Sequence, residues 1–132
     1  MRLLHNAQLL VSCLSLAGQE ELPTSDGLFD RALKIALDKG AFPEWTRDSI
    51  HFTDSRIGLR CVELPAILDM AQKADLTTAP NPSYHRTRVH LNDRAARRLL
   101  RNLDVQEEKA REWGQVLGKA LNQAETELAS FG

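Results

Sequence analysis

The sequence predicts a single α+β domain that is mainly helical, with about five helices around a small antiparallel sheet of two to three strands. The chain has 132 residues, of which 42% are hydrophobic, and this is enough to bury one core. Several long stretches place apolar residues three and four positions apart, which is typical of helices. Shorter stretches alternate apolar and polar residues, which is typical of strands. We therefore expect one globular domain over residues 1–132.

The N-terminal stretch predicts a core helix. Residues 2–17 repeat apolar side chains at spacings of three and four, and Gly18 follows as a natural stop. Residues 9–17 resemble the apolar part of a signal peptide. Polar side chains interrupt the run and a single arginine precedes it, so we favour a helix covered on much of its circumference.

A linker and a second helix are predicted next. Residues 20–24 contain Pro23 and are expected to be irregular. The helix has Ser25 or Asp26 as its N-terminal cap, because either side chain can accept hydrogen bonds from free backbone N–H groups. It ends at Gly40, which suits the C-terminal position of a helix.

The middle of the chain predicts a β-hairpin and a third helix. Ser49–Thr53 and Ile57–Glu63 alternate apolar and polar residues, and a turn-like segment lies between them. Pro65 suits the first turn of the helix that follows. Residues 77–83 contain two prolines and are expected to be a loop.

A further strand and helix are predicted from Tyr84 onward. Tyr84–Leu91 alternate small or apolar residues with polar ones, which favours a half-buried strand. The alternative is a helix that begins at Pro82 and runs straight through. Asn92 is expected to cap the next helix, which reaches Leu103.

The last helix carries a stripe of small residues. A capping-box pattern over Asp104–Glu107 predicts its start, and it continues to about Leu128. Ala110, Gly114 and Gly118 repeat at a spacing of four within it. Glycine inside a helix costs about 1 kcal/mol relative to alanine, so the stripe predicts that another backbone passes close by. That backbone belongs either to the same chain or to a partner helix in a homodimer.

Positive charge is concentrated in one short segment. The formal net charge of the whole chain is −1, and an overall acidic balance counts against a general nucleic-acid binder. Residues 84–103 nevertheless contain six arginines and a single acid, a local charge of +5. This segment is the candidate working surface, and its natural partner is an anion.

The arginines of the predicted helix share one face. At about 100° per residue, those in 93–103 fall within a third of the circumference, opposite a face of alanines and leucines. On the preceding strand, Tyr84 and His90 would share a face with two more arginines. The planar guanidinium fork suits phosphate and carboxylate. The predicted anion-binding residues are Tyr84, Arg86, Arg88, Arg94, Arg97, Arg98 and Arg101.

An alternative is that the protein neutralises these arginines itself. Acids follow at once, at Asp104, Glu107, Glu108 and Glu112. If the final helix folds back, they can pair with the arginine face, and such surface pairs contribute only about 0–1 kcal/mol each.

Enzymatic functions find less support. Histidine, arginine and tyrosine together can cleave RNA without a metal, and residues 84–90 contain all three, so a small metal-independent ribonuclease is one alternative. We expect no metal, because the four histidines form no HxH, HxxxH or HExxH pattern. We expect no cofactor either, because the chain has no glycine-rich phosphate loop and no nucleophile elbow.

The two cysteines indicate a compartment. Cys13 and Cys61 lie in apolar runs without metal-binding spacing, so we expect two buried thiols in a reducing, cytoplasmic environment. No run approaches the roughly 18 apolar residues that a membrane span needs, and we expect no membrane partner.

The functional prediction is a non-enzymatic binding or regulatory module. Its basic strand–helix surface, residues 84–103, would engage an anionic partner, with nucleic acid ahead of an acidic protein surface. The alternatives are a protein–protein adaptor that assembles through the long C-terminal helix, and the ribonuclease.

Overall fold

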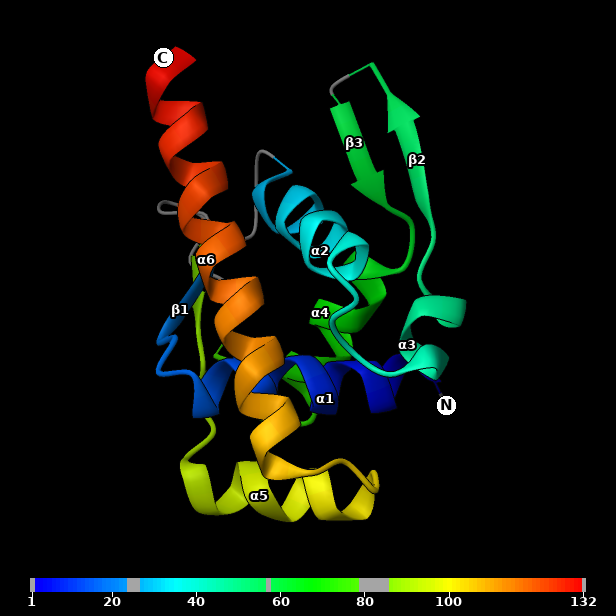
Figure 1. The fold of residues 1–132 in the computed structure, drawn as a ribbon, viewed down its shortest axis with the longest axis vertical. Helices are drawn as coiled ribbons and strands as arrows, with labels where there is room; N and C mark the ends of the chain where they lie inside the picture. The colour runs from blue at the N-terminus through cyan, green and yellow to red at the C-terminus, as the bar shows by residue number, and fades with distance from the viewer. Residues whose placement is uncertain (1, 24–26, 57, 79–85, 132) are drawn as a thin grey trace.

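The protein is a mainly helical α+β domain, as predicted. In this computed structural model, residues 2–23, 27–56, 58–78 and 86–131 are described, and they form six helices and four short strands (Figure 1). The helices are α1 (Arg2–Leu16), α2 (Leu28–Asp38), α3 (Glu44–Ser49), α4 (Leu64–Lys73), α5 (Asp93–Asn102) and α6 (Glu107–Phe131). The strands are β1 (Glu21–Pro23), β2 (Phe52–Ser55), β3 (Gly58–Cys61) and β4 (Arg86–Arg88).

Helix α1 lies at the centre of the molecule. It packs against α4, α5 and α6, and Figure 1 shows α6 crossing it and α5 lying across one end of the molecule. Nine of its 15 residues are buried, more than a single helix face can hold, so the expected core helix is confirmed. Its buried residues include Cys13, and the second cysteine, Cys61, is buried as well. Burial of this apolar surface is the main favourable term in folding.

The small-residue stripe of α6 packs within the chain. A Cβ atom at Gly114 would overlap the carbonyl group of Cys13 and lie 3.0 Å from the Cβ of Ala17. Ala110 and Gly118 are buried along the same side of α6. Of the two partners that the spacing allowed, the backbone that passes close by is therefore that of α1 in the same chain, so this stripe gives no support to a homodimer.

The strands form two separate sheets instead of one. A hairpin is confirmed as β2–β3, with Phe52 opposite Cys61, and it projects from the body of the molecule (Figure 1). Its first strand begins and ends later than predicted, because Asp54 and Ser55, expected in the turn, belong to β2. The other sheet pairs β1 with β4 antiparallel, with Leu22 opposite Thr87. The linker predicted for residues 20–24 is therefore wrong over β1. Three residues are too few for a strand to show its alternation of apolar and polar side chains.

Strand β4 confirms the strand predicted over residues 84–91 at Arg86–Arg88, whereas His90 and Leu91 belong to no strand. Val89 extends the pairing through a bridge to Thr77, and the helical alternative does not hold for these residues. Several predictions fall on residues outside the described part of the chain, which include Ser25, Asp26, Ile57, Tyr84, His85 and residues 79–83 of the predicted loop.

Helix α3 was not predicted. Ser49, expected to open the first strand of the hairpin, is the last residue of α3 instead. Its hydroxyl lies 2.7 Å from the carbonyl oxygen of Trp45 and 3.1 Å from that of Thr46, and donates to this pair. A serine that bonds back to the preceding turn is compatible with a short helix, and two turns are too short for a hydrophobic period to appear.

The turn between α5 and α6 differs from the predicted capping box. Asp104 has a φ of 59°, in the left-handed region, and its N–H donates to the carbonyl of Arg101. The N–H of Val105 donates to the carbonyl of Leu100, which completes a Schellman ending of α5. Asp104 therefore ends α5, and α6 begins only at Glu107. An aspartate tolerates this backbone conformation better than most residues do, so it can serve here in place of glycine.

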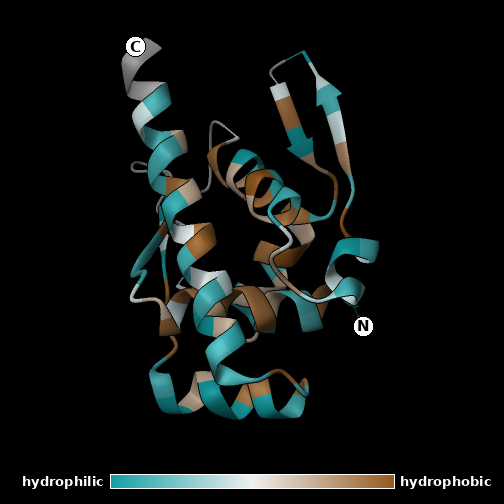
Figure 2. Ribbon diagram, viewed as in Figure 1, coloured by the Kyte–Doolittle hydropathy of each residue, from teal (hydrophilic) through white to brown (hydrophobic). Residues whose placement is uncertain are grey.

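The hydropathy pattern agrees with this packing. Figure 2 shows hydrophobic residues on α1, α2 and α4, while hydrophilic residues dominate α5. None of the described helices combines the length and the apolar character needed to cross a membrane.

Candidate anion-binding site

Helix α5 is held with one face inward and one face outward. Asn92 caps it as predicted, because its side-chain oxygen accepts a hydrogen bond of 2.8 Å from the N–H of Ala95. Ala96 and Leu100 are buried, and α5 packs mainly on α1. The segment before the cap is tied to α1 as well, since the Ser15 hydroxyl donates to the carbonyl of Leu91 at 2.7 Å. The arginine side of the helix is therefore turned away from the core.

Three arginines on this outward side have no partner in the part of the chain that the structure describes. Arg94, Arg98 and Arg101 are exposed, and none makes a hydrogen bond or ion pair among the described residues. They stand three and four residues apart, and like charges at these spacings destabilise a helix by a few tenths of a kcal/mol per pair. We call these three residues the free arginine face. An anion placed on it would relieve the repulsion.

The fourth arginine of the helix is already paired. The Arg97 Nε lies 2.7 Å from Oε1 of Glu107, and Oε2 of the same carboxylate lies 3.1 Å from Arg111 Nη2. Desolvation opposes the charge of Glu107, but the hydrogen bonds from Arg97 and Arg111 together outweigh it and lower the pKa of this carboxyl below its ordinary value. The self-neutralisation that the sequence left open therefore occurs at one of the four positions on α5.

The strand contributes less free charge than the pattern suggested. Arg86 lies between two carboxylates of the protein, 2.9 Å from Glu21 and 3.1 Å from Glu125. Partial burial opposes its charge, but these two partners raise the pKa of Arg86 above its usual range. Arg88 is exposed and has no ion pair among the described residues, although Glu21 stands opposite it in the register of the sheet.

A shallow pocket opens where α5 meets α6. It has a volume of about 320 Å³ and is lined by Arg97, Leu100, Arg101, Val105 and Glu107. Its floor is apolar, because Leu100 is 1% exposed and Val105 is half-buried. Its rim carries two guanidinium groups, one paired and one free. This combination suits an anionic group attached to an apolar or flat body.

Three of the residues suggested for ribonuclease chemistry lie in the described part of the chain: Arg86, Arg88 and His90. Arg86 is held by its two carboxylates, and the ring of His90 lies 3.2 Å from Asp75 Oδ1. Tyr84 and His85 lie outside the described residues. Within the described part of the chain, no three histidine, cysteine, aspartate or glutamate side chains are placed to hold a metal ion.

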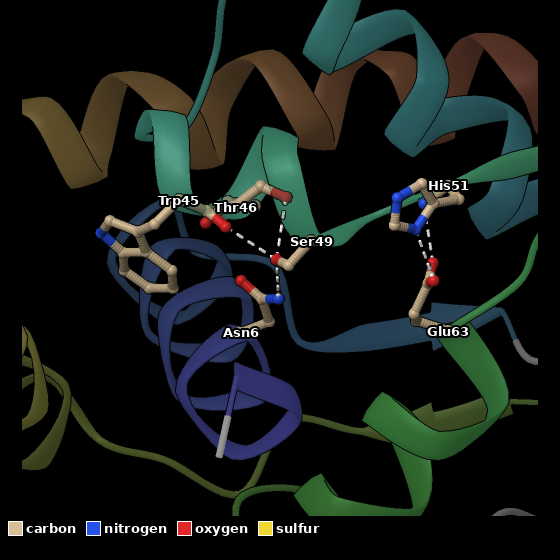
Figure 3. Close-up of polar contacts among 6 residues, drawn as sticks. All are labelled: Asn6, Trp45, Thr46, Ser49, His51 and Glu63. Carbon is tan, nitrogen blue, oxygen red and sulfur yellow. Dashed lines mark hydrogen bonds and ion pairs between the residues drawn. The ribbon is translucent and has the colours of Figure 1, made fainter.

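Two polar contacts were not foreseen from the sequence (Figure 3). The backbone N–H of His51 donates to Glu63 Oε1 at 2.7 Å, and its ring Nδ1 lies 2.7 Å from Oε2 of the same carboxylate. This clamp ties the start of the hairpin to the start of α4. Asn6 is buried on α1 and donates from Nδ2 to the Ser49 hydroxyl at 2.8 Å. The partners stand 12 and 43 residues apart, so no local sequence pattern could reveal them.

Comparison of the chain with family models, with curated proteins and with solved structures found no match. The inference of function therefore rests on the side chains of the site and on their chemistry.

Proposed function

We propose that this domain is a non-enzymatic module that binds the phosphate backbone of nucleic acid through the free arginine face of α5. The observation that carries the proposal is that Arg94, Arg98 and Arg101 are exposed and unpaired among the described residues, on a helix whose other face is anchored in the core. The rigid placement of these arginines favours binding, because a helix that is already ordered loses little conformational entropy when it binds a partner.

The spacing of the three guanidinium groups favours a linear polyanion. From Arg94 to Arg101 the helix rises about 10 Å, at roughly 1.5 Å per residue. A nucleic-acid strand passes about three phosphates over that length, at roughly 3.4 Å per step. Each guanidinium can offer two parallel N–H donors to one phosphate. If the bound nucleic acid runs past the end of β4, the exposed Arg88 provides a further contact to phosphate.

The acidic remainder of the chain sets the expected strength of binding. Residues outside 84–103 carry more acids than bases, so the domain repels a polyanion except at the arginine face. Three phosphate contacts predict a plot of log affinity against log salt with a slope of about −2 for single strands and about −3 for duplex. Binding should therefore be clear at low salt and lost at high salt.

The test is a salt series with a labelled RNA oligonucleotide and a labelled DNA duplex, followed by fluorescence anisotropy. The triple variant R94Q/R98Q/R101Q should lose binding at every salt concentration. The matched control K39Q/R56Q/K119Q removes the same charge from exposed sites just after α2, in the turn of the hairpin and on α6. It should retain most of the affinity. Absence of binding by the wild-type domain at low salt would refute the proposed function.

A reducing compartment fits this proposal. Cys13 and Cys61 are both free and buried, and burial raises the pKa of the Cys61 thiol to about 11. Buried thiols of this kind serve as small apolar core residues. We therefore propose a cytoplasmic location, where nucleic acid is an available partner.

A further inference from the structure

On the outward side of α5, Arg97 is the only arginine with a partner among the described residues. That partner is the carboxylate of Glu107. It uses its two oxygens separately: Oε1 accepts from Arg97 across the turn, and Oε2 accepts from Arg111 one turn further along α6. Both arginines are about half exposed, and so is Glu107. The contact therefore lies at the surface, where an incoming anion can reach it.

Glu107 also lines the pocket between α5 and α6. The pocket holds the paired Arg97 and the free Arg101 on its rim, over Leu100 and Val105. A carboxylate and a phosphate are recognised by the same guanidinium geometry. The Glu107 carboxylate thus stands where a phosphate would bind if it were to engage Arg97 and Arg101 together.

We propose that this pocket is a phosphodiester subsite and that Glu107 is its internal competitor, displaced from Arg97 when nucleic acid binds. The inference rests on the proposed function and extends it, because it adds a fourth phosphate contact and assigns a restraint to a named residue. Val105 and Leu100 would lie against the sugar or base that follows the bound phosphate.

Displacing Glu107 from Arg97 costs little free energy, because Glu107 keeps its second partner, Arg111. When Arg97 turns to a phosphate, Oε2 can remain on Arg111, which lies four residues away on the same helix. Exposed ion pairs are weak and screened by salt, so a multiply charged strand can outcompete a single carboxylate. The position of Glu107 in the first turn of α6 also favours its charge when it is released from Arg97.

The neighbouring acids are not arranged in this way. Glu112 pairs with Lys109 at 3.9 Å on α6 itself. Glu108 is exposed and makes no ion pair among the described residues. Glu108 therefore provides a matched control, since it differs from Glu107 by one position and by the absence of the contact to Arg97.

The test compares the affinities of E107Q and E108Q for the labelled RNA oligonucleotide at low salt, with thermal unfolding to confirm that both variants are folded. Both lose one negative charge. E107Q should bind about two- to fivefold more tightly than E108Q, the gain that follows from releasing a surface pair. In an R97Q background the additional E107Q substitution should give no more gain than E108Q does.

Equal affinities of E107Q and E108Q would overturn the inference while leaving the proposed function intact. A gain for a glutamate-rich peptide without a gain for RNA would also overturn it, because the pocket would then be a carboxylate site. If wild type, E107Q and E108Q all fail to bind RNA at low salt, the proposed function fails and this inference fails with it.

Discussion

Gly114 of α6 lies against the backbone carbonyl group of Cys13 of α1, with no space for a side chain between the two helices. This contact sets the distance at which α6 crosses the central helix. It thereby sets the position of the first turn of α6, which carries Glu107, relative to α5.

The first prediction is that Gly114→Ala destabilises the protein although alanine is the better helix former. The added methyl would overlap the Cys13 carbonyl, and overpacking of this kind costs about 1–3 kcal/mol. The free energy of unfolding in urea measures it. Gly118→Ala is the control. Its Cβ would meet only the flexible side chain of Gln19 at 3.4 Å, so this variant should be neutral or stabilised by up to about 1 kcal/mol.

The second prediction concerns the left-handed residue that ends α5. Asp104→Gly should stabilise the protein by about 0.5–1 kcal/mol, because glycine adopts a φ of 59° without steric cost. Asp104→Val should destabilise it by about 1 kcal/mol or more, since a β-branched side chain is strained there. Thermal unfolding of the two variants gives the comparison. Destabilisation by both would show that the aspartate side chain makes a contribution of its own.

The third prediction contrasts a buried hydroxyl group that has no hydrogen-bond partner with one that accepts a hydrogen bond. The Thr46 Oγ1 is buried with no hydrogen-bond partner among the described residues, so Thr46→Val should stabilise the domain by about 1 kcal/mol while conserving its shape. Ser49→Ala serves as the contrast. It removes the acceptor of the buried Asn6 amide and should cost about 1–3 kcal/mol. Chemical denaturation measures both changes in the free energy of unfolding. A loss of stability in Thr46→Val would show that the Thr46 hydroxyl has a hydrogen-bond partner after all.

The fourth prediction is a pH dependence that arises from the His51–Glu63 clamp. Desolvation acts against the charge of Glu63, but the hydrogen bonds from the ring and backbone of His51 lower the pKa of this carboxyl. The folded-state pKa therefore lies below the unfolded one. The stabilisation is complete above the ordinary carboxyl pKa and is lost as the pH falls through the lowered value. Its size is about 1 kcal/mol or less, because the histidine is exposed.

The measurement is the free energy of unfolding from neutral pH to about pH 3, in wild type and in Glu63→Gln. The acid-induced loss should be smaller in the variant, because its amide does not titrate. Glu44→Gln is the control, since Glu44 is an exposed acid without an ion pair among the described residues. It should follow the wild-type curve. If the free energy of unfolding depended on pH in the same way in wild type and in Glu63→Gln, the His51–Glu63 clamp would not be a source of acid sensitivity.

Much of the fold could be predicted because local patterns reflect local structure. The spacing of apolar residues identified α1 as a core helix. The turn-like segment 54–56 identified the hairpin, although Asp54 and Ser55 of that segment belong to β2. Asn92 identified the start of α5. Each of these signals depends on residues within a few positions of one another, and backbone hydrogen bonding and side-chain direction act over the same range. The short elements α3 and β1 were missed because each holds fewer than two full periods of its pattern, six residues in α3 and three in β1.

The sequence by itself determined that the arginines of α5 share one face, because helical periodicity decides this whatever the helix packs against. Only the tertiary structure decided which of the chain's arginines are free. Arg86 meets Glu21 and Glu125, which are 65 and 39 residues away along the chain, whereas the arginines at 94, 98 and 101 meet no acid among the described residues. Ion pairs depend on distance in space, and the packing of α1, α5 and α6 sets those distances.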